Sequence, residues 1–382
     1  MATVKLGDIA IEAKSSNKGD KTGIRIVGLE HLTPSNVTLS SWSEDTENTF
    51  TKEFSKGDVL FGRRRAYLKK AAVAPFDGIC SGDITVIRAI EGKVDPDLLP
   101  FIIQNDFLFE FAVGKSAGSL SPRVKWTHLK EFAIELPSMP AQSKLAETLW
   151  SINETKNAYE DLINKTDELV KSQFIEMFGE LGKDDKGWGL TTIGECCELN
   201  PKRPRDINDE LLVSFVPMPA VSEDGKIDCS DIKPYKEVRK GFTYFAENDV
   251  LFAKITPCME NGKGAVAKGL EGGIGSGSTE FHVLRPIIGK SNPYWLYILT
   301  MFESFRVGAR KVMTGTGGQL RVPIGYLNDY PISLPPIESQ ERFEEIVHQS
   351  DKSKFALQEA IKDLDALSKK IIAENLIPAG KE

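Results

Sequence analysis

The sequence predicts an α+β protein in which two similar mixed α/β domains are joined by a pair of long antiparallel helices, a pseudo-two-fold symmetric coiled coil. Three observations support this fold class. Leu-Pro-x-x-x-x-Gln at residues 136–142 returns at 334–340, and Asp-Val-Leu-Phe at 58–61 returns at 249–252. A Gly-Ile-x-Ser-Gly segment at 78–82 returns at 273–277, and a long amphipathic run follows each Leu-Pro. A period of about 200 residues indicates a duplicated domain, because solenoid repeats are ~20–50 residues long.

The two domains share one predicted layout. In the first domain, residues 1–137, Gly, Asn, Ser and Pro separate β-rich runs at 24–27, 59–61 and 84–87. A helix is expected from Pro96 to about Phe107. In the second domain, residues 187–335, strands are expected near 213–217, 250–252 and 280–284 and a helix near 293–307. Strands and helices do not alternate regularly, so a parallel doubly wound sheet is not expected.

Two helical segments complete the predicted division, a central spacer at 138–186 and a C-terminal helix at 336–382. Each spans ~35–40 residues, on the order of 55 Å, and Gly179, Gly182 and Gly187 indicate where the first one ends. Apolar residues at steps of three and four form the predicted pairing and partner-binding seam: Leu145, Leu149, Ile152, Tyr159, Ile163, Val170, Leu357, Ile361, Leu364 and Ile371. The plainer alternative is an interdomain spacer or a homodimerisation seam.

Composition bounds the class of protein. At 382 residues the chain suits two or three domains, and 41% apolar with 27% charged residues is typical of a soluble globular protein. No apolar run approaches the ~18–20 residues of a membrane span, and the start lacks a secretory signal pattern. Five cysteines without a Cys-x-x-Cys pair predict free thiols in a reducing compartment. We therefore expect a cytoplasmic protein without a membrane partner.

The net charge of −7 lies in the helical segments. Residues 141–186 hold 6 basic and 10 acidic side chains, and residues 338–382 hold 7 and 10. The rest of the chain is balanced, with 35 of each sign. Near-neutral domains with local basic clusters remain compatible with nucleic acid as a partner.

The ordered double occurrence of these motifs resembles the DNA specificity (S) subunits of type I restriction–modification systems. The resemblance covers the whole chain and includes Leu-Gly-Asp-Ile at 6–9 and its counterpart at 188–195. It implies a non-catalytic recognition subunit whose two target recognition domains read the halves of a split double-stranded DNA site. It also implies that the helices dock two methyltransferase (modification) subunits and that restriction/translocase subunits join the complex. S-adenosylmethionine, ATP and Mg are then expected on those partners and no cofactor on this chain.

Candidate DNA contacts come from basic or glycine-rich loops. Residues 61–70 place five Lys or Arg residues directly after a strand. Arg grips a guanine edge or a phosphate with two hydrogen bonds, whereas Lys acts as a point charge. The candidates are Arg63, Arg64, Arg65, Lys69, Lys70, Lys115, Ser119, Arg123, Lys202, Arg203, Arg205, Lys254, Thr256, Asn261, Lys263, Thr316, Gln319 and Arg321. The alternatives are solvated basic loops, intradomain salt bridges or ordinary turns.

No catalytic or metal-ligating residues are predicted. Asn-Pro-Tyr-Trp at 292–295 lacks the second Pro of the adenine methyltransferase motif, and no glycine-rich nucleotide-binding motif is present. The four histidines stand far apart, without the spacing of ligands or of a triad. Two other classes stay open, an enzyme with cryptic chemistry and a non-DNA adaptor that binds a two-fold protein partner through its helices.

Overall fold

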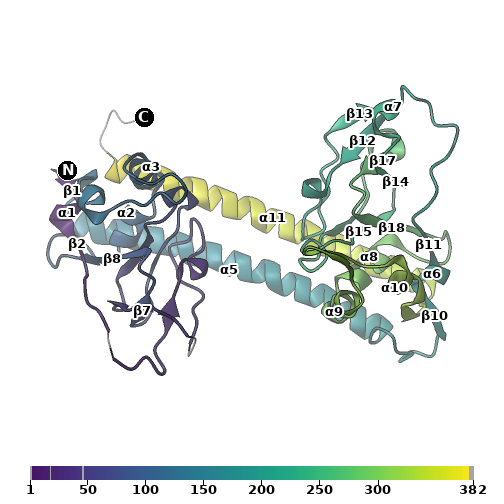
Figure 1. The fold of residues 1–382 in the computed structure, drawn as a ribbon, viewed down its shortest axis with the longest axis horizontal. Helices are drawn as coiled ribbons and strands as arrows, with labels where there is room; N and C mark the ends of the chain where they lie inside the picture. The colour runs from purple at the N-terminus through teal and green to yellow at the C-terminus, as the bar shows by residue number, and fades with distance from the viewer. Residues whose placement is uncertain (1, 18, 45–46, 378–382) are drawn as a thin grey trace. The chain divides into compact units, whose positions relative to one another are not determined.

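The computed structural model describes residues 2–17, 19–44 and 47–377. Contacts divide the chain into two compact units, one formed by Met1–Asp161 with Leu357–Glu382 and the other by Leu162–Ala356. Each unit holds one of the predicted domains and part of each long helix (Figure 1). The domain boundaries expected from the sequence (1–137, 138–186, 187–335 and 336–382) assigned each long helix to a segment of its own. Those boundaries stay a prediction.

The first unit contains two main sheets. The larger has the strand order β2-β8-β5-β6 and is antiparallel throughout, while the smaller has the order β3-β7-β4 with β3 parallel to β7. Strands β1 and β9 pair separately and close the domain. The elements are β1 Ala2–Lys5, α1 Leu6–Ile9, β2 Ala10–Glu12, β3 Ile26–Val27, η1 Leu29–His31, β4 Lys52–Phe54, β5 Val59–Gly62, η2 Ala66–Leu68, β6 Ala71–Val73, β7 Gly78–Cys80, β8 Ile84–Ala89, α2 Leu99–Ile103, α3 Asp106–Gly114, α4 Trp126–Leu129 and β9 Ala133–Leu136.

The second unit repeats this plan with additions. Its sheets have the orders β11-β18-β15-β16 and β13-β12-β17-β14, beside the pair β10-β21 and a hairpin β19-β20. The elements are β10 Leu190–Thr192, α6 Ile193–Cys196, β11 Cys197–Leu199, β12 Leu212–Val216, η3 Met218–Ala220, β13 Ile232–Pro234, α7 Tyr235–Val238, β14 Thr243–Ala246, β15 Val250–Ala253, β16 Gly264–Val266, η4 Glu271–Gly273, β17 Ile274–Gly277, β18 Phe281–Pro286, α8 Pro293–Met301, α9 Glu303–Lys311, β19 Thr314–Thr316, β20 Gln319–Arg321, α10 Ile324–Asp329 and β21 Pro331–Ser333.

The repeated Asp-Val-Leu-Phe segment is the central strand of each larger sheet. Phe61 of β5 pairs with Thr85 of β8, and Phe252 of β15 pairs with His282 of β18. The leading aspartates are also equivalent. Asp58, 2% exposed, accepts two hydrogen bonds from Arg88, and Asp249, 1% exposed, accepts two from Arg285. The aspartate of the motif is therefore a buried carboxylate paired with a partly exposed arginine.

Both ranges predicted as one helix are helical, but each holds two shorter helices, so the predicted continuity was wrong. In the first unit Asn105 has extended backbone angles and its side chain accepts a hydrogen bond from the backbone N–H of Leu108. This capping starts α3 anew. In the second unit Phe302 is extended between α8 and α9, and its ring packs 5.1 Å from that of Phe174. A local cap and a tertiary contact thus interrupt runs whose apolar spacing is continuous.

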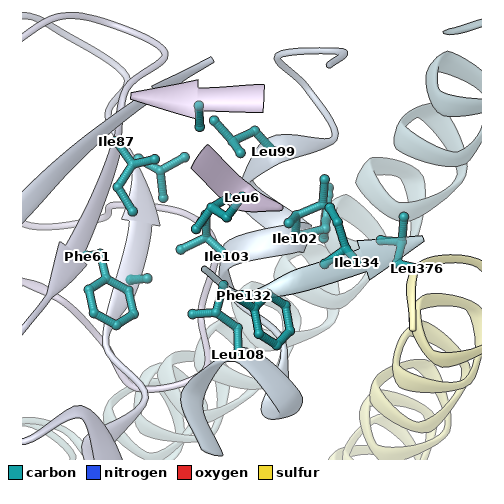
Figure 2. Packing of buried hydrophobic residues seen from close by; sticks show 14 of the residues in the cluster. Leu6, Phe61, Ile87, Leu99, Ile102, Ile103, Leu108, Phe132, Ile134 and Leu376 are labelled. Carbon is teal, nitrogen blue, oxygen red and sulfur yellow. The ribbon is translucent and has the colours of Figure 1, made fainter. Parts of the chain in front are cut away.

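The two long helices are as expected, with 40 residues each in α5 (Met139–Phe178) and α11 (Ile337–Leu376). Gly179 follows α5 with φ +83° and its N–H donates to the carbonyl of Ile175, which ends the helix as predicted. In the first unit Leu376 of α11 is buried in one hydrophobic cluster with Leu6, Ile102 and Ile134 (Figure 2). Leu149 of α5 belongs to the same cluster.

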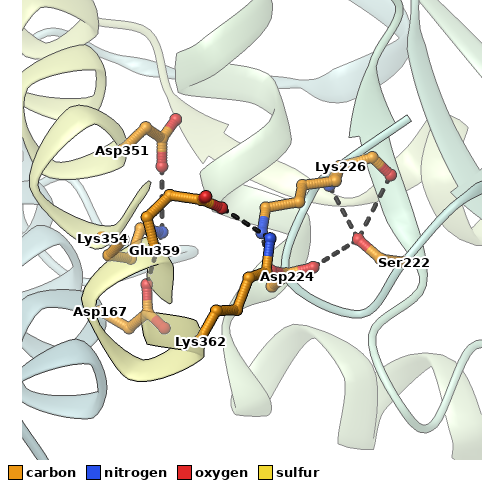
Figure 3. A network of polar contacts seen from close by, with 8 residues as sticks. All are labelled: Asp167, Ser222, Asp224, Lys226, Asp351, Lys354, Glu359 and Lys362. Atoms are coloured by element: carbon orange, nitrogen blue, oxygen red, sulfur yellow. Dashed lines mark hydrogen bonds and ion pairs between the residues drawn. The ribbon is translucent and has the colours of Figure 1, made fainter. Parts of the chain in front are cut away.

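In the second unit the same two helices bring other segments together. The rings of Phe178 and Phe343 lie 5.3 Å apart, and those of Phe174 and Phe343 5.4 Å. On the same two helices Lys354 of α11 donates to Asp167 of α5 at 2.8 Å and pairs with Asp351 at 3.0 Å (Figure 3). In each unit residues near the start of one helix meet residues near the end of the other, so the helices run antiparallel.

The repeated glutamine explains the Leu-Pro-x-x-x-x-Gln pattern. In the first unit Gln142, 2% exposed, accepts from the N–H of Asp95 and donates to the carbonyl of Pro137. In the second unit Gln340, fully buried, accepts from the N–H of Asn292 and donates to the carbonyl of Pro335. Each glutamine therefore ties the start of a long helix to the chain just before the domain's own helices.

Candidate nucleic-acid interface

In the first unit the basic loop after β5 lies against the loop before α4. The N–H of Arg63 donates to the carbonyl of Asp83 at 3.0 Å, and the N–H of Arg65 donates to the carbonyl of Pro122 at 2.8 Å. A further backbone bridge joins Arg64 to Arg123. Two loops about 60 residues apart in the sequence thus form one surface, which we call the first basic face (residues 63–65, 83 and 121–123).

Arg64 and Arg123 converge on one carboxylate. Asp83 accepts from Nε of Arg123 at 2.7 Å and from its Nη2 at 3.2 Å, and Nη1 of Arg64 lies 3.5 Å away. Arg64 also donates to the hydroxyl of Ser121 at 3.2 Å. The hydrogen bond from Arg123 holds the pKa of Asp83 below its usual value, so the carboxylate is ionised at neutral pH. The face therefore presents two cations around one anion.

The arginines and the lysines of the run 61–70 differ in what their side chains contact. Arg65 is exposed, and the Nε atoms of Arg63 and Arg64 are buried without a hydrogen-bond partner in the described part of the chain. Lys69 instead donates to Asp106 at the start of α3, and Lys70 donates to the carbonyl of Leu29. Both lysine ammonium groups make hydrogen bonds within their own domain, and that of Lys69 is an ion pair.

Two other candidates of the first domain stand in the glycine-rich loop. Lys115 is exposed, with its ammonium 5.8 Å from the centre of the Phe111 ring. Ser119 is exposed in the same loop. The ends of this loop are bridged at Ala117 and Arg123, so Ser119 lies in a loop that begins and ends beside the first basic face, while Lys115 stands two residues before the bridge.

The second unit builds an equivalent face from different side chains. The N–H of Lys254 donates to the carbonyl of Glu280 at 2.9 Å, and the N–H of Thr256 donates to the carbonyl of Leu320 at 3.0 Å. Arg321 makes hydrogen bonds to Glu280 through Nε at 2.9 Å and Nη2 at 2.7 Å. We call residues 254–256, 280 and 319–321 the second basic face.

Several candidates in the second unit are already engaged. The hydroxyl of Thr256 donates to the carbonyl of Gly318 and accepts from the N–H of Leu320, so it holds the β19-β20 hairpin. The amide of Asn261 donates to Glu223. Thr316 and Gln319 on the hairpin are exposed, and Lys263 is half-buried. The hairpin side chains are therefore the more accessible ones.

The loop carrying Lys202, Arg203 and Arg205 begins beside the second basic face. The amide nitrogen of Asn200 lies 3.2 Å from Nδ1 of His282, whose Nε2 lies 2.9 Å from the carbonyl oxygen of Val322. Lys202 and Arg205 are exposed, while Arg203 donates to the carbonyl of Phe242 and lies over the ring of Tyr235. Burial lowers the pKa of His282 below its usual value, so this histidine is neutral at pH 7.

The predicted seam residues are used within this chain to different degrees. Leu149 and Val170 are buried in hydrophobic clusters of their own units. The others are half-buried, namely Leu145, Ile152, Tyr159, Ile163, Leu357, Ile361, Leu364 and Ile371. Leu169 and Leu367, which were not predicted, are 53% and 45% exposed. Their positions differ by 198, the shift of the helical repeat, which is the signal that could have found them.

Asp83 and Glu280 were also missed. Each lies in the turn before a strand of the larger sheet, and neither belongs to a charge run or a repeated motif.

No helix of the described residues is long and apolar enough to cross a membrane. Within those same residues no cluster of three or more His, Cys, Asp and Glu side chains is arranged to hold a metal ion, and all five cysteines carry free thiols.

The fold defines a duplicated protein, in which two similar domains carry equivalent but dissimilar basic faces and are joined by two long helices. The family model of the type I restriction modification DNA specificity domain matches residues 1–167 and 185–364. The chain therefore belongs to this family, and the resemblance inferred from the repeated motifs is confirmed.

Curated relatives agree. The EcoEI specificity subunit of Escherichia coli is 37% identical over 225 residues, which cover 56% of this chain and 37% of the relative. The EcoAI specificity subunit of the same organism is 41% identical over 188 residues, 46% of this chain and 31% of that relative. The matched parts thus span about a third of these relatives.

Solved structures support the fold along the whole chain. A chain from a structure on complex assembly and conformational transition of the type I R-M system is 20% identical, with a TM-score of 0.57 over 98% of this chain and 97% of that one. The type I S subunit from M. genitalium is 12% identical, with a TM-score of 0.52 over 99% and 96%. The predicted fold class is confirmed.

Proposed function

We propose that this chain is the DNA-recognition subunit of a type I restriction–modification complex and that each domain reads one half of a split target. The observation that carries the proposal is the double construction of a basic face at the same place in each domain. The backbone hydrogen bonds of Arg63 and Arg65 recur at Lys254 and Thr256, while the side chains differ. Two surfaces with the same backbone arrangement but different side chains suit two half-sites of different sequence.

The chemistry of the faces fits duplex DNA. Exposed cations around each face, such as Arg65, Lys115 and Lys202, supply phosphate contacts that do not depend on sequence. Arginines and the exposed amide of Gln319 supply donors that pair with guanine and adenine edges in the major groove. The net charge of −7 does not oppose this, because the excess acid lies on the helical segments.

The helices α5 and α11 are the proposed docking surface for two modification subunits, and restriction/translocase subunits complete the complex. Leu169 and Leu367 expose apolar side chains at equivalent positions, one in each unit. Two equivalent contacts suit two copies of one partner. The chain itself acts as a non-catalytic subunit, and S-adenosylmethionine, ATP and Mg belong to the partners. A cytoplasmic location follows from this role.

The alternative of a non-DNA adaptor rests on the same helices. It does not account for the two basic faces, because a docking surface on the helices has no need of them. A negative gel shift of the assembled complex on any duplex at low salt, where phosphate contacts are strongest, would favour the adaptor.

The test uses the full chain assembled with modification subunits from its own cells. Genome-wide mapping of methylated adenine, with and without this chain, gives the target. Arg64→Ala should then weaken binding to the unaltered target duplex about tenfold. It should also remove discrimination against base changes in one half-site and leave discrimination in the other half-site intact. Lys93→Ala is the matched control, because Lys93 is an exposed cation beyond the opposite end of β8. Methylation that does not depend on the chain, or loss of discrimination at both halves, would refute the proposal.

A further inference from the structure

The same carboxylate–arginine unit stands in both basic faces. Asp83 holds Arg123 and Glu280 holds Arg321, in each case through Nε and Nη2 of the guanidinium. The two carboxylates occupy equivalent places, because their backbone carbonyls accept from the N–H groups of Arg63 and Lys254. The carboxylate–arginine pair therefore recurs at the same backbone position in both domains, although one carboxylate is an Asp and the other a Glu.

The carboxylate binds the Nε side of each guanidinium and leaves the Nη1–Nη2 edge of Arg123 accessible. In Arg321, Nη1 also donates one hydrogen bond to the carbonyl of Gln319 at 3.3 Å, so one Nη1 hydrogen and the outer Nη2 hydrogen remain. A guanidinium has five donors in a rigid planar fork. Once the Nε side is bound to a carboxylate, the edge formed by Nη1 and the outer hydrogen of Nη2 still points away from it. The side chains of Arg123 and Arg321 are 42% and 41% exposed. Bidentate contact with O6 and N7 of guanine requires two such coplanar donors.

Stability alone does not account for the unit. Both arginines are far from buried, and ion pairs at this exposure contribute little to folding because water screens them. A partly covered carboxylate at the centre of a DNA-facing surface also repels phosphate, which weakens binding to DNA of any sequence. The arrangement thus lowers non-specific affinity while fixing the plane of the arginine.

We propose that Asp83 and Glu280 are positioning residues that set base specificity, each orienting one arginine toward a guanine edge in its own half-site. The inference rests on the proposed function and adds the residues that control discrimination. Asp83 also lies 3.5 Å from Arg64, whereas Ile255 stands at the place of Arg64 in the second domain. Asp83 therefore orients two arginines and Glu280 orients one.

The test is selection from a pool of duplexes with randomised sequence by the full complex, carrying wild-type chain, Asp83→Asn or Glu280→Gln. Asparagine and glutamine keep size and one acceptor oxygen but remove the charge. We expect Asp83→Asn to reduce base preference about tenfold at positions of one half-site and Glu280→Gln to do so at the other. Both variants should bind the unselected pool more tightly than wild type at low salt, since each removes a negative charge.

Two companion variants separate positioning from packing. Asp83→Glu and Glu280→Asp keep the carboxylate and should retain most of the preference, with an unchanged thermal unfolding midpoint in all four variants. If Asp83→Asn and Glu280→Gln kept the base preference of wild type, the inference would be overturned and the proposed function would stand. The same follows if Asp83→Glu and Glu280→Asp lost as much base preference as the neutral variants. A wild-type complex that selects no sequence would overturn the proposed function as well, so the two failures are distinguishable.

Discussion

The ammonium of Lys156 on α5 donates to the carboxylate of Asp365 on α11 at 2.8 Å within the first unit. The second unit contains the same pair with the helices exchanged, because Lys354 of α11 donates to Asp167 of α5, also at 2.8 Å. The two lysines lie 198 residues apart in the sequence, and the two aspartates are separated by the same 198 residues. Lys156 and Lys354 interrupt the apolar seam that the sequence predicts, and their side chains are only 15% and 16% exposed.

Replacement of Lys156 by alanine should destabilise the first unit by about 1–2 kcal/mol, more than a surface pair and less than a fully buried one, because Asp365 is half exposed. The measurement is urea unfolding of the chain. Lys156→Met keeps the aliphatic stem and should cost less. In a double-mutant cycle with Asp365→Ala, a coupling energy of about 0.5 kcal/mol or more is expected, and strict additivity would refute the interaction.

The buried amide of Gln340 predicts a larger effect. Gln340→Ala leaves the N–H of Asn292 and the carbonyl of Pro335 without their partner inside the second unit. Unsatisfied buried groups of this kind cost about 2–3 kcal/mol in total. The loss should appear in the free energy of unfolding. Gln349→Ala, at an exposed position of the same helix, is the control and should stay within about 0.5 kcal/mol of wild type.

The sequence repeat predicts the main helices and central strands but not the partners of their buried polar side chains. Because each helix keeps its period and each central strand its Asp-Val-Leu-Phe, the pattern identified β5, β15, α5 and α11. It did not explain why Gln142 or Asp58 recurs, since their partners, Asp95 and Arg88, lie 47 and 30 residues away. A motif therefore marks one end of a contact and leaves the other end unassigned.

The candidate interface was predictable to a similar extent. The cations of the run 61–70 were visible as composition, yet the structure separates Arg64, on the basic face, from Lys69, which binds Asp106. The pairs Asp83–Arg123 and Glu280–Arg321 span 40 and 41 residues and carry no local pattern. Contacts between distant loops depend on how the strands are ordered, and spacing along the chain does not encode that order.

A pH dependence is expected from His282. Burial holds its pKa below the usual 6.5, so below that pH the unfolded chain binds a proton that the folded domain does not bind. Stability of the second unit should therefore fall as the pH drops from 7 toward 5, by up to about 1.4 kcal/mol per pH unit. Thermal unfolding of wild type and His282→Gln across this range measures it.

The first unit supplies the contrast, because Thr85 occupies the place of His282. His282→Gln should flatten the pH profile, while His128→Gln, at an exposed histidine of the first unit, should leave it unchanged. An equally steep profile in His282→Gln would show that other groups set the acid sensitivity.

The exposed leucines of the long helices give the sharpest test of partner docking. Leu169→Glu and Leu367→Glu each place a charge where an apolar side chain, about half exposed here, would be covered by a modification subunit. If the two positions serve two partners, each single variant should hold one modification subunit, and the double variant none. The mass of the assembled complex, from light scattering after size-exclusion chromatography, distinguishes these states. Ser151→Glu, at an exposed polar site of α5, should assemble as wild type does. Full assembly of the double variant would move the docking surface away from these residues.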